Sequence, residues 1–504
     1  MRCLFAQRGI FFLIFFTIVS YALSSRASTY ISVGDDVNRI LDRLEAEGIL
    51  RSGLLSTKPI SRKEAVRLLK EAESNVEGRS SFIRSLVRSL RERLDQGGTG
   101  ETVIQPVDVV YGKYIHTNAD VLTLVYEGAQ EKEQAFNYNN DGDLYAAGEN
   151  FRTGFTSRID DLGPFSLYLN PEFRSSKDDH DLVLRTAYGV LHFGWDLVLG
   201  RDAQWWGPGY NGAILLSNNA EPFTMVRLTN PVSEPLPWIF KYLGPLKFTF
   251  FVTRLDKDRN DFAEPQLWGM RFDFKPHPLL EVGLERTALM GGQGRPEGPG
   301  TWIDGFFGRN EHGSNETGDQ RAGYDLKLTL PFRLQPLQVY WQAAGEDNVH
   351  GYPTQWAYLA GIYLPRVLAC ERIGLRAEYA STHMTHHPGS AWYTHHIYTS
   401  GYTYNDMIIG HHMGSDSRDA FFELSYRMPE RNARIALSYD EKQHNVSEPV
   451  RETTSETALH AEISLARRVN LMASCGYGRI KNPGNLAGPT RGVSAFTGGV
   501  QYQF

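Results

Sequence analysis

The sequence predicts a mainly β protein, in which a large antiparallel transmembrane β-barrel follows a small N-terminal bundle of three helices. Three observations predict this fold. The chain starts with a segment typical of export signals, the next segment has helical periodicity, and the remainder alternates apolar and polar residues in many short segments. A length of 504 residues is enough for several ordinary domains or for one large barrel with an appendage.

Residues 1–27 have the pattern of a signal peptide. Two arginines precede an apolar run over residues 9–23, and Ser25 and Ala27 are small residues of the kind found at a cleavage site. We therefore expect the rest of the chain to be exported.

Composition argues against several classes of protein. After the signal, no apolar stretch reaches the about 20 residues that a membrane-spanning helix needs. The formal net charge of -6 at pH 7 gives no support for nucleic-acid binding, which usually requires a concentrated basic face. The aromatic content of 12% suits the aromatic girdles of a β-barrel, although secreted β-sandwiches share this bias.

Two cysteines remain beyond the signal, because Cys3 precedes the apolar run. Cys370 and Cys475 are too few for a disulfide scaffold. They could form one bridge in an oxidising compartment, but two isolated cysteines are more often free thiols. We therefore expect both to be free.

Residues 28–100 are predicted to form three short amphipathic helices. The first has apolar residues at helical spacing over 37–44. The second begins at a capping box, in which Glu64 follows Ser61 by three residues. The third has an apolar face over 82–94 and stops at two glycines. Each helix alone would bury little surface, so we expect the three to pack together and against the next domain.

From about residue 103 the hydrophobic period changes to two, and residues 101–504 are predicted to form the barrel. The clearest alternating segments are residues 268–274, 324–330 and 422–428. Similar segments continue to the C-terminus and amount to roughly 16 to 20 strands of about ten residues, which is the spanning length of a tilted strand.

Periodicity alone leaves open which side of these strands is buried. In a sandwich the apolar side faces a second sheet, whereas in a membrane barrel it faces lipid and the polar side lines the lumen. The last segment favours the barrel, because its apolar residues alternate with small or polar ones and it ends in Phe504. This resembles the C-terminal signature of bacterial outer-membrane proteins, which closes the barrel and is read by the insertion machinery. An ordinary terminal strand is the alternative.

A central stretch resembles a known family. Residues 199–210 read Leu-Gly-Arg-Asp-Ala-Gln-Trp-Trp-Gly-Pro-Gly-Tyr, and residues 215–220 read Leu-Leu-Ser-Asn-Asn-Ala. Both are similar to the central signature of the capsule-assembly Wzi family. Further pieces agree with this family in their order, at residues 243–245, 284–287, 291–296, 345–347 and 397–411. The resemblance covers essentially the whole mature chain.

The resemblance implies a barrel of about 18 strands in the cell outer membrane, with a periplasmic helical bundle that occludes its lower end. It also implies a lectin-like protein that binds capsular or exopolysaccharide and helps to assemble or retain it at the cell surface. Such a protein contacts outer-membrane lipid, needs no cofactor and performs no chemistry on the polymer. Two alternatives stay open, a channel or transporter for a polar solute and a carbohydrate-modifying enzyme.

The central stretch also contains the residue types that recognise sugars. Aromatic rings cover the C–H face of a sugar, and planar polar groups bond its hydroxyls. The binding residues expected from this stretch are Arg201, Trp205, Trp206, Asn218 and Asn219. For the two tryptophans, packing inside the lumen is the favoured interpretation, because aromatic residues more often serve packing.

Five charged residues extend the set of expected binding residues: Glu285, Arg286, Arg295, Glu346 and Asp347. They follow strand segments or lie in loops, where they could meet an acidic polymer. Arginine suits a uronate carboxylate, because its planar fork can bond both oxygens. A network of charges that stiffens the lumen explains the same residues equally well.

The sequence predicts no dedicated metal site. Seven histidines gather between residues 383 and 412, but they show no recognisable ligand spacing. Asp141 and Asp143 flank a glycine in an Asn-rich loop, yet they lack the full calcium-loop pattern. Glu281 and Glu285 lie on one face of a strand, as many lumenal acids do, so they do not identify a glycosidase.

Overall fold

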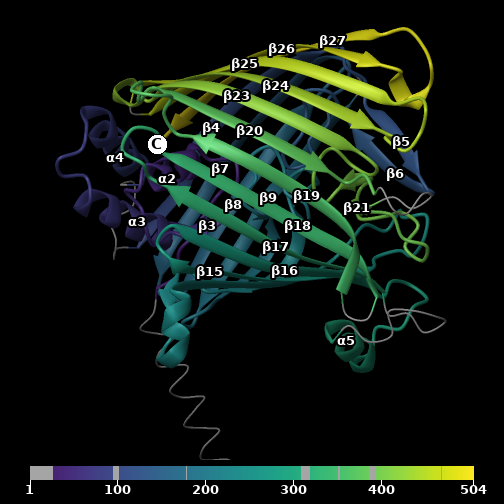
Figure 1. Ribbon diagram of the computed structural model, residues 1–504, viewed down its shortest axis with the longest axis horizontal. Coiled ribbons are helices and arrows are strands. Elements are labelled where there is room, and N and C mark those ends of the chain that lie inside the picture. The colour runs from purple at the N-terminus through teal and green to yellow at the C-terminus, as the bar shows by residue number, and fades with distance from the viewer. Residues whose placement is uncertain are drawn as a thin grey trace, which may run out of the picture.

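A closed barrel of 18 antiparallel strands forms most of the molecule, and three helices lie across one of its ends (Figure 1). The computed structural model describes residues 26–94, 102–177, 179–307, 318–349, 352–384, 392–466 and 468–504. The predicted domain boundaries stay predictions, because residues 1–25 and 95–101 lie outside the described residues.

The helical head consists of α2 (Asp36–Ala46), α3 (Arg62–Ser74) and α4 (Ser81–Leu94). Asp35 caps α2 by accepting from the Val37 amide, and Ser61 caps α3 by accepting from the Glu64 amide, as the capping box predicts. The apolar faces of the three helices form one buried core. Among the described helices, none is both long enough and apolar enough to cross a membrane.

The barrel strands follow one another around the wall with antiparallel pairing. In chain order they are β4 (Val103–Thr117), β7 (Gly148–Leu162), β8 (Phe165–Ser175), β9 (His180–His192), β10 (Asp196–Asp202), β12 (Phe223–Thr229), β13 (Glu234–Pro235), β14 (Pro245–Arg254), β15 (Gln266–His277), β16 (Leu280–Met290), β17 (Gly318–Leu330), β18 (Leu337–Val349), β19 (Tyr352–Leu364), β20 (Ile373–Ser381), β23 (Arg418–Met428), β24 (Ala433–His444), β25 (Glu452–Ala466), β26 (Val469–Lys481) and β27 (Arg491–Gln503). The short β12 and β13 both pair with β14 and together make up one of the 18 strands of the wall.

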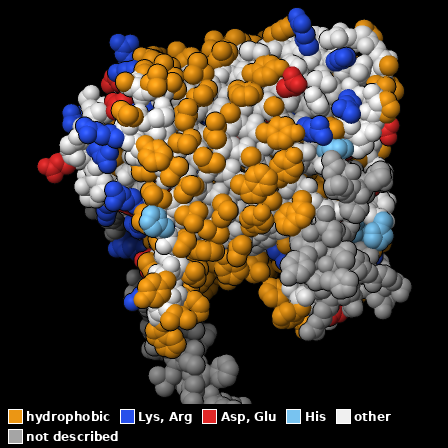
Figure 2. Space-filling view, in the orientation of Figure 1, with side chains coloured by type: hydrophobic (Ala, Val, Ile, Leu, Met, Phe, Trp, Pro, Cys, Tyr) orange, Lys and Arg blue, Asp and Glu red, His pale blue; other side chains and the backbone are white. Residues whose placement is uncertain are grey.

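The apolar side of the strands faces outward. Along β23, Phe422 and Leu424 are exposed, whereas Glu423 between them is buried in the lumen. Figure 2 shows the same pattern over the visible wall, which apolar side chains cover almost without charges. A sandwich would bury this side, so the prediction of a membrane-spanning barrel is confirmed.

The C-terminal strand closes the barrel. β27 pairs with β26 on one side and with the first barrel strand, β4, on the other. Phe496, Val500, Tyr502 and Phe504 lie on its exposed side, as their alternation predicts. Closure leaves no unpaired strand edge in contact with lipid.

Both cysteines of the barrel are free, as predicted from their number. Cys370 lies in the loop between β19 and β20, and Cys475 lies on β26. The barrel therefore holds together without a disulfide.

Two apolar elements project from the same side of the barrel, one near each end (Figure 1). The 3-10 helix η1 (Trp238–Leu243) exposes Trp238 and Tyr242 near the head, and α5 (Pro299–Phe306) exposes Ile303 at the opposite end. Apolar surface thus extends beyond the strands themselves.

Three inward-folded loops fill much of the lumen. Loop 203–222 carries β11 (Trp205–Trp206), which pairs with β2 (Thr57–Lys58) of the head segment. Loop 118–147 contains the hairpin β5 (Leu122–Tyr126) and β6 (Ala129–Glu133), and loop 382–417 contains β21 (Thr403–Tyr404) and β22 (Met407–Ile408). Side chains of loops 203–222 and 382–417 form a buried apolar core inside the barrel together with inward-facing strand residues such as Phe251, Leu267 and Leu359. The interior is therefore less polar than the alternation of the strands predicts, because both the loops and some inward-facing strand positions are apolar.

Ion pairs fasten the head to the barrel. Asp36 lies 2.7 Å from Nη2 of Arg427, and Arg39 lies 2.6 Å from Glu462. Deeper in the lumen, Glu45 accepts from Lys275 at 2.5 Å and from Lys327 at 2.8 Å. A short sheet, β1 (Tyr30–Ile31) with β3 (Ile60–Ser61), completes the head.

An arginine placed on the lipid-facing side should destabilise the barrel. We expect Leu424→Arg, near the middle of β23, to lower the free energy of unfolding by about 2–4 kcal/mol, because the charge must enter lipid. Urea unfolding of protein folded into vesicles measures this loss. Leu486→Arg, in the exposed loop between β26 and β27, is the matched control and should change little. Equal losses at both positions would contradict the lipid-facing assignment.

Docking of the head should weaken in acid. Burial raises the pKa of Asp36, but Arg427, Arg39 and Arg93 outweigh it and hold this pKa well below the usual range. The carboxylate therefore stabilises the folded chain above the unfolded pKa of about 3.9, and this contribution is lost as pH falls through the lower folded value. We expect Asp36→Asn to lower stability at pH 7 by about 1–3 kcal/mol and to flatten the acid limb of the stability curve. Urea unfolding between pH 7 and pH 3 measures both effects, and an unchanged acid limb would refute the assignment.

Candidate functional site

A pocket of about 480 Å³ lies at the rim of the barrel opposite the head. This rim pocket is formed where β8, β9, β10 and β12 approach loop 118–147. It is lined by Asp141, Arg174, Val183, Leu184, Arg185, Ala187, Gly200, Arg201, Glu221, Pro222 and Thr224. Short turns join the strands at the head end and long loops join them at the rim, and in outer-membrane barrels the end with long loops is the extracellular one.

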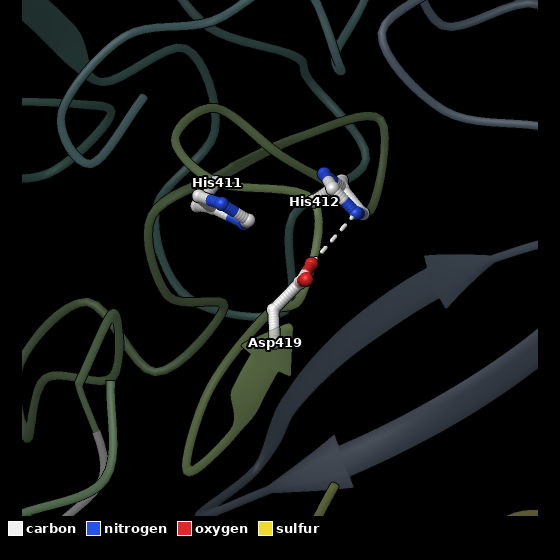
Figure 3. A group of neighbouring side chains, drawn as sticks. All are labelled: His411, His412 and Asp419. Atoms are coloured by element: carbon white, nitrogen blue, oxygen red, sulfur yellow. Dashed lines mark ion pairs between the residues drawn. The ribbon is translucent and has the colours of Figure 1, made fainter. Parts of the chain in front are cut away.

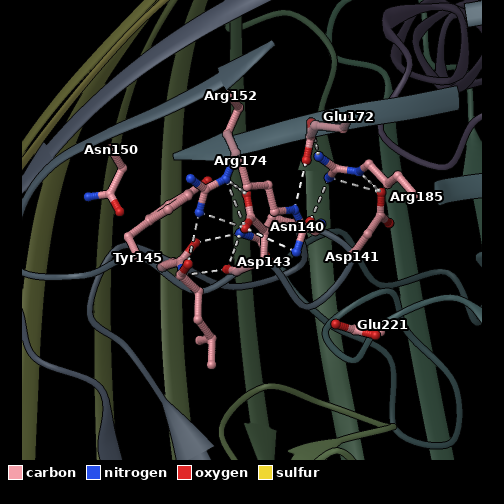
Figure 4. A network of polar contacts seen from close by, with 12 residues as sticks. Asn140, Asp141, Asp143, Tyr145, Asn150, Arg152, Glu172, Arg174, Arg185 and Glu221 are labelled. Carbon is pink, nitrogen blue, oxygen red and sulfur yellow. Dashed lines mark hydrogen bonds and ion pairs between the residues drawn. The ribbon is translucent and has the colours of Figure 1, made fainter. Parts of the chain in front are cut away.

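Three arginines and two carboxylates give the rim pocket its polar character. Arg185 lies 3.1 Å from Asp141 and 3.2 Å from Glu172, as Figure 4 shows. Arg174 donates to Glu172 over 3.0 Å, and Arg201 lies 2.6 Å from Glu221. The exposed fractions of the side chains are 12% for Arg185, 19% for Arg174 and 29% for Arg201. Arg201 is therefore the arginine most accessible to a ligand.

Loop 118–147 is held tightly against the pocket. Gly142 has a φ of +69°, and a Cβ there would lie 2.5 Å from the backbone nitrogen of Glu221. Asn218 donates to Asp141 Oδ1 over 3.0 Å, and the Asp141 amide donates to the Asn218 carbonyl over 2.8 Å. Arg152 binds Asp143 over 3.0 Å. Arginines thus engage both carboxylates of the calcium-like Asp-Gly-Asp sequence, and Asn218 positions the loop.

A second cavity of about 350 Å³ lies inside the lumen, between the head and the inward-folded loops. Trp205, Tyr210 and Asn218 line it from loop 203–222, and Arg39 lines it from α2. The Tyr210 hydroxyl donates to Glu423 over 2.9 Å. Burial and the Glu423 carboxylate raise the pKa of Tyr210 to about 12, so the hydroxyl keeps its proton. We call this space the inner cavity.

The two tryptophans of the central stretch lie deep in the lumen. Trp206 is fully buried, its amide donates to the Leu216 carbonyl over 2.8 Å, and its ring meets Phe251 edge to face at 5.4 Å. The ring nitrogen of Trp205 donates to the Gly207 carbonyl over 3.2 Å. Trp206 contributes to the apolar core of the loops, and Trp205 is a wall of the inner cavity.

Three further expected residues are buried within the lumen. Asn219 donates to the Ile408 carbonyl over 3.0 Å and so joins two inward-folded loops. Glu285 lies 2.7 Å from Arg271, and Glu346 forms an ion pair with Arg321. Asp347 belongs to β18, but its side chain lies outside the described residues. The two glutamates thus belong to lumenal charge networks.

Arg286 and Arg295 lie near the outer end of the barrel, away from the rim pocket. Arg286 donates to the Gly305 and Phe306 carbonyls at the C-terminus of α5, which a cation stabilises. The Arg295 guanidinium lies 5.2 Å from the Phe262 ring centre and 5.3 Å from that of Tyr398. The structure therefore does not bring the ten predicted residues together in one site.

The sequence did not single out Arg174 and Arg185. Each lies in an alternating strand segment next to an apolar residue, as do many lumenal charges. Their common position at the rim follows from the register of β8 against β9, which no local pattern specifies.

The two kinds of arginine in the rim pocket should differ in their effect on stability. We expect Arg185→Ala to cost about 3–5 kcal/mol, because it leaves the buried Glu172 and the half-buried Asp141 without this cation. Arg201→Ala should cost about 0–1 kcal/mol, because its pair with Glu221 is partly solvated. Urea unfolding compares the two variants, and similar losses would refute this ranking.

Comparisons with known proteins agree with this architecture. The family model described as capsule assembly protein Wzi matches residues 124–494. An uncharacterized 55.8 kDa protein in the cps region of Klebsiella pneumoniae is 33% identical over 181 residues, which span 35% of this chain and only 36% of that relative.

A solved structure shares the fold over nearly the whole chain. Wzi of Escherichia coli, an outer-membrane protein involved in group 1 capsule assembly and a carbohydrate-binding β-barrel, superposes with a TM-score of 0.73 at 22% identity. The superposition covers 95% of this chain and 100% of that one. Because the family model spans most of the sequence, from the first inward-folded loop to the last strand, the chain belongs to the capsule assembly protein Wzi family.

Proposed function

We propose that this chain is an outer-membrane lectin, which binds capsular or exopolysaccharide and helps to assemble or retain it at the cell surface. Its family membership and the carbohydrate binding of the Escherichia coli barrel support this proposal. We further propose that lipid covers the apolar wall and that the insertion machinery recognises the terminal strand ending in Phe504.

The rim pocket is the observation that carries the proposal. Glu172 pairs with both Arg174 and Arg185, whereas Arg201 has the single, partly exposed partner Glu221. The pair between Arg201 and Glu221 is partly exposed, so a carboxylate on a polymer can take the place of Glu221. A guanidinium fork bonds both oxygens of such a group, and it also donates to sugar hydroxyls. An acidic polysaccharide is therefore the preferred ligand.

We infer that binding leaves the polymer chemically unchanged. Hydrolysis of a glycosidic bond usually requires two carboxyl groups, one of which donates a proton. In the rim pocket, Asp141 is paired with Arg185 and Glu221 with Arg201. Both carboxylates are thus engaged by arginines.

A filled lumen argues against the channel alternative. The head lies across one end, and the inward-folded loops pack an apolar core into the interior. The inner cavity of about 350 Å³ lies between these two obstructions.

Binding should depend on Arg201 more than on a matched surface arginine. We expect Arg201→Ala to weaken binding of the cell's own surface polymer about tenfold, the effect of one charge-assisted contact. Isothermal titration of detergent-purified protein with that polymer measures the affinity. Arg295→Ala, which lies away from the rim pocket, tests in parallel whether binding extends to that part of the barrel's outer end.

Arg372→Ala is the matched control, because Arg372 pairs with Glu430 over 2.7 Å on the surface at the head end. Its affinity should equal that of the unmodified chain. In cells, deletion of the gene should release polymer into the medium without stopping its synthesis. Unchanged retention after deletion, or chemically altered polymer after incubation with the protein, would overturn the proposal.

A further inference from the structure

A buried group of metal-ligand side chains lies where the inward-folded loops meet the barrel wall. His411 and His412 come from loop 382–417, Asp419 from the start of β23 and Asp440 from β24. All four residues are at least nine-tenths buried. Figure 3 shows His411 and His412 beside Asp419, which approaches them from the strand below. We call these four residues the histidine–aspartate cluster.

The ligand atoms of His411, His412 and Asp419 lie close together, and Asp440 lies beside His412. Nε2 of His412 lies 3.1 Å from Asp419 Oδ2 and 3.7 Å from Asp440 Oδ2. Ligand atoms of His411, His412 and Asp419 all lie within 4.8 Å of one another. A tetrahedral ion with bonds of about 2.0–2.2 Å sets its ligand atoms about 3.3–3.6 Å apart. A small contraction would therefore let His411, His412 and Asp419 surround an ion, with Asp440 beside His412 as the fourth candidate ligand.

Several of these atoms are buried without a well-formed hydrogen bond. Nε2 of His412 and both carboxylate oxygens of Asp440 make no hydrogen bond of ordinary distance and angle to the described residues, although Asp440 is ion-paired with His412 and lies beside Tyr138. Buried polar atoms are nearly always satisfied in folded proteins, so such atoms point to a ligand. The ring of His412 stacks on Tyr138 with centres 4.1 Å apart, which fixes its orientation.

We propose that the histidine–aspartate cluster binds one divalent transition-metal ion of the zinc class through His411, His412, Asp419 and Asp440. Two neutral imidazoles and two carboxylates balance the charge of a divalent ion, and four protein ligands fill its tetrahedral coordination. Any proton held by an imidazole leaves to solvent as the ion binds. The histidines stand next to each other in the sequence, and the carboxylates come from two strands, which is why no ligand spacing marks the site.

The ligand types separate this cluster from a second one. Imidazole nitrogens favour zinc, copper and nickel, whereas calcium and magnesium favour oxygen. Glu133, His444 and Glu452 also converge, but His444 already contacts Ser417 Oγ at 3.1 Å and Glu452 accepts from the Gly484 amide at 2.6 Å. With one imidazole where the first cluster has two, the second cluster suits this class of ion less well and serves as a control.

The ion would join the inward-folded loops to the barrel. Loop 382–417 and two strands supply its ligands directly. Loop 118–147 contacts the site through Tyr138 on His412, and loop 203–222 contacts it through Asn211, which donates to Asp419 over 3.5 Å. Gly212 also lies against His411, where a Cβ would be 2.2 Å from ring carbon Cδ2. One ion at this junction would therefore stabilise all three loops in their inward-folded position inside the lumen.

Metal titration of the purified full chain tests the proposal. After treatment with a chelator, the protein should bind one zinc ion per chain in isothermal titration, and zinc should raise its unfolding temperature. Cobalt(II) should give the visible absorption of a tetrahedral site. Calcium and magnesium should have no such effect. His412→Gln and Asp440→Asn should each weaken zinc binding more than the about 10- to 100-fold that loss of an outer-shell partner costs.

Glu452→Gln is the control for the second cluster, and His192→Gln is the control for an ordinary buried His–Asp pair. Both should keep the affinity of the unmodified chain. Circular dichroism verifies that each variant still forms the barrel, and Gly212→Ala, which changes no ligand, should weaken zinc binding by displacing His411. The proposal is overturned if the unmodified chain binds no zinc, if Glu452→Gln abolishes binding, or if folded His412→Gln binds as tightly as the unmodified chain.

Discussion

The need to pair every backbone amide and carbonyl within lipid governs this structure. In a bilayer core no water replaces a missing partner, so a spanning sheet must close on itself. Pairing of β27 with β4 provides that closure. Once the sheet is closed, alternation along each strand sends one set of side chains to lipid and the other into the lumen. The lipid-facing wall, the buried charges and the space for the loops all follow from this one constraint.

Closure creates an interior that the chain must fill. Much of it is occupied by charges that compensate one another, as where Arg271 meets Asp273, Glu285 and Asp325 with all four side chains fully buried. Such groups are costly to bury and even more costly to separate, so they hold neighbouring strands in one register. The remaining space is filled by loops that carry an apolar core of their own. Head, loops and wall therefore support one another, and the rim is where we propose that a polymer binds.

Several residues that the sequence predicts to bind sugar instead stabilise the barrel and its loops. Trp206 packs in the loop core, Asn219 ties two loops together, and Glu285 belongs to a lumenal ion network. Arg201 differs, because its partner Glu221 is also partly solvated and the pair lies at the rim. Residue types that recognise sugars are the same types that stabilise a filled barrel, so composition alone does not separate the two uses.

Local pattern by itself determined the helices, the alternating strands, the closing C-terminal segment and the family, because each depends on residues adjacent in the chain. Alternation left open which side was buried, and only the closed sheet decided it. The rim pocket brings Arg174, Arg185 and Arg201 together from three strands, and the histidine–aspartate cluster combines a loop with β23 and β24. Both depend on strand register and on the way in which the long loops fold back into the lumen. These are contacts between residues far apart in sequence, so their geometry arises only when the barrel is closed and filled.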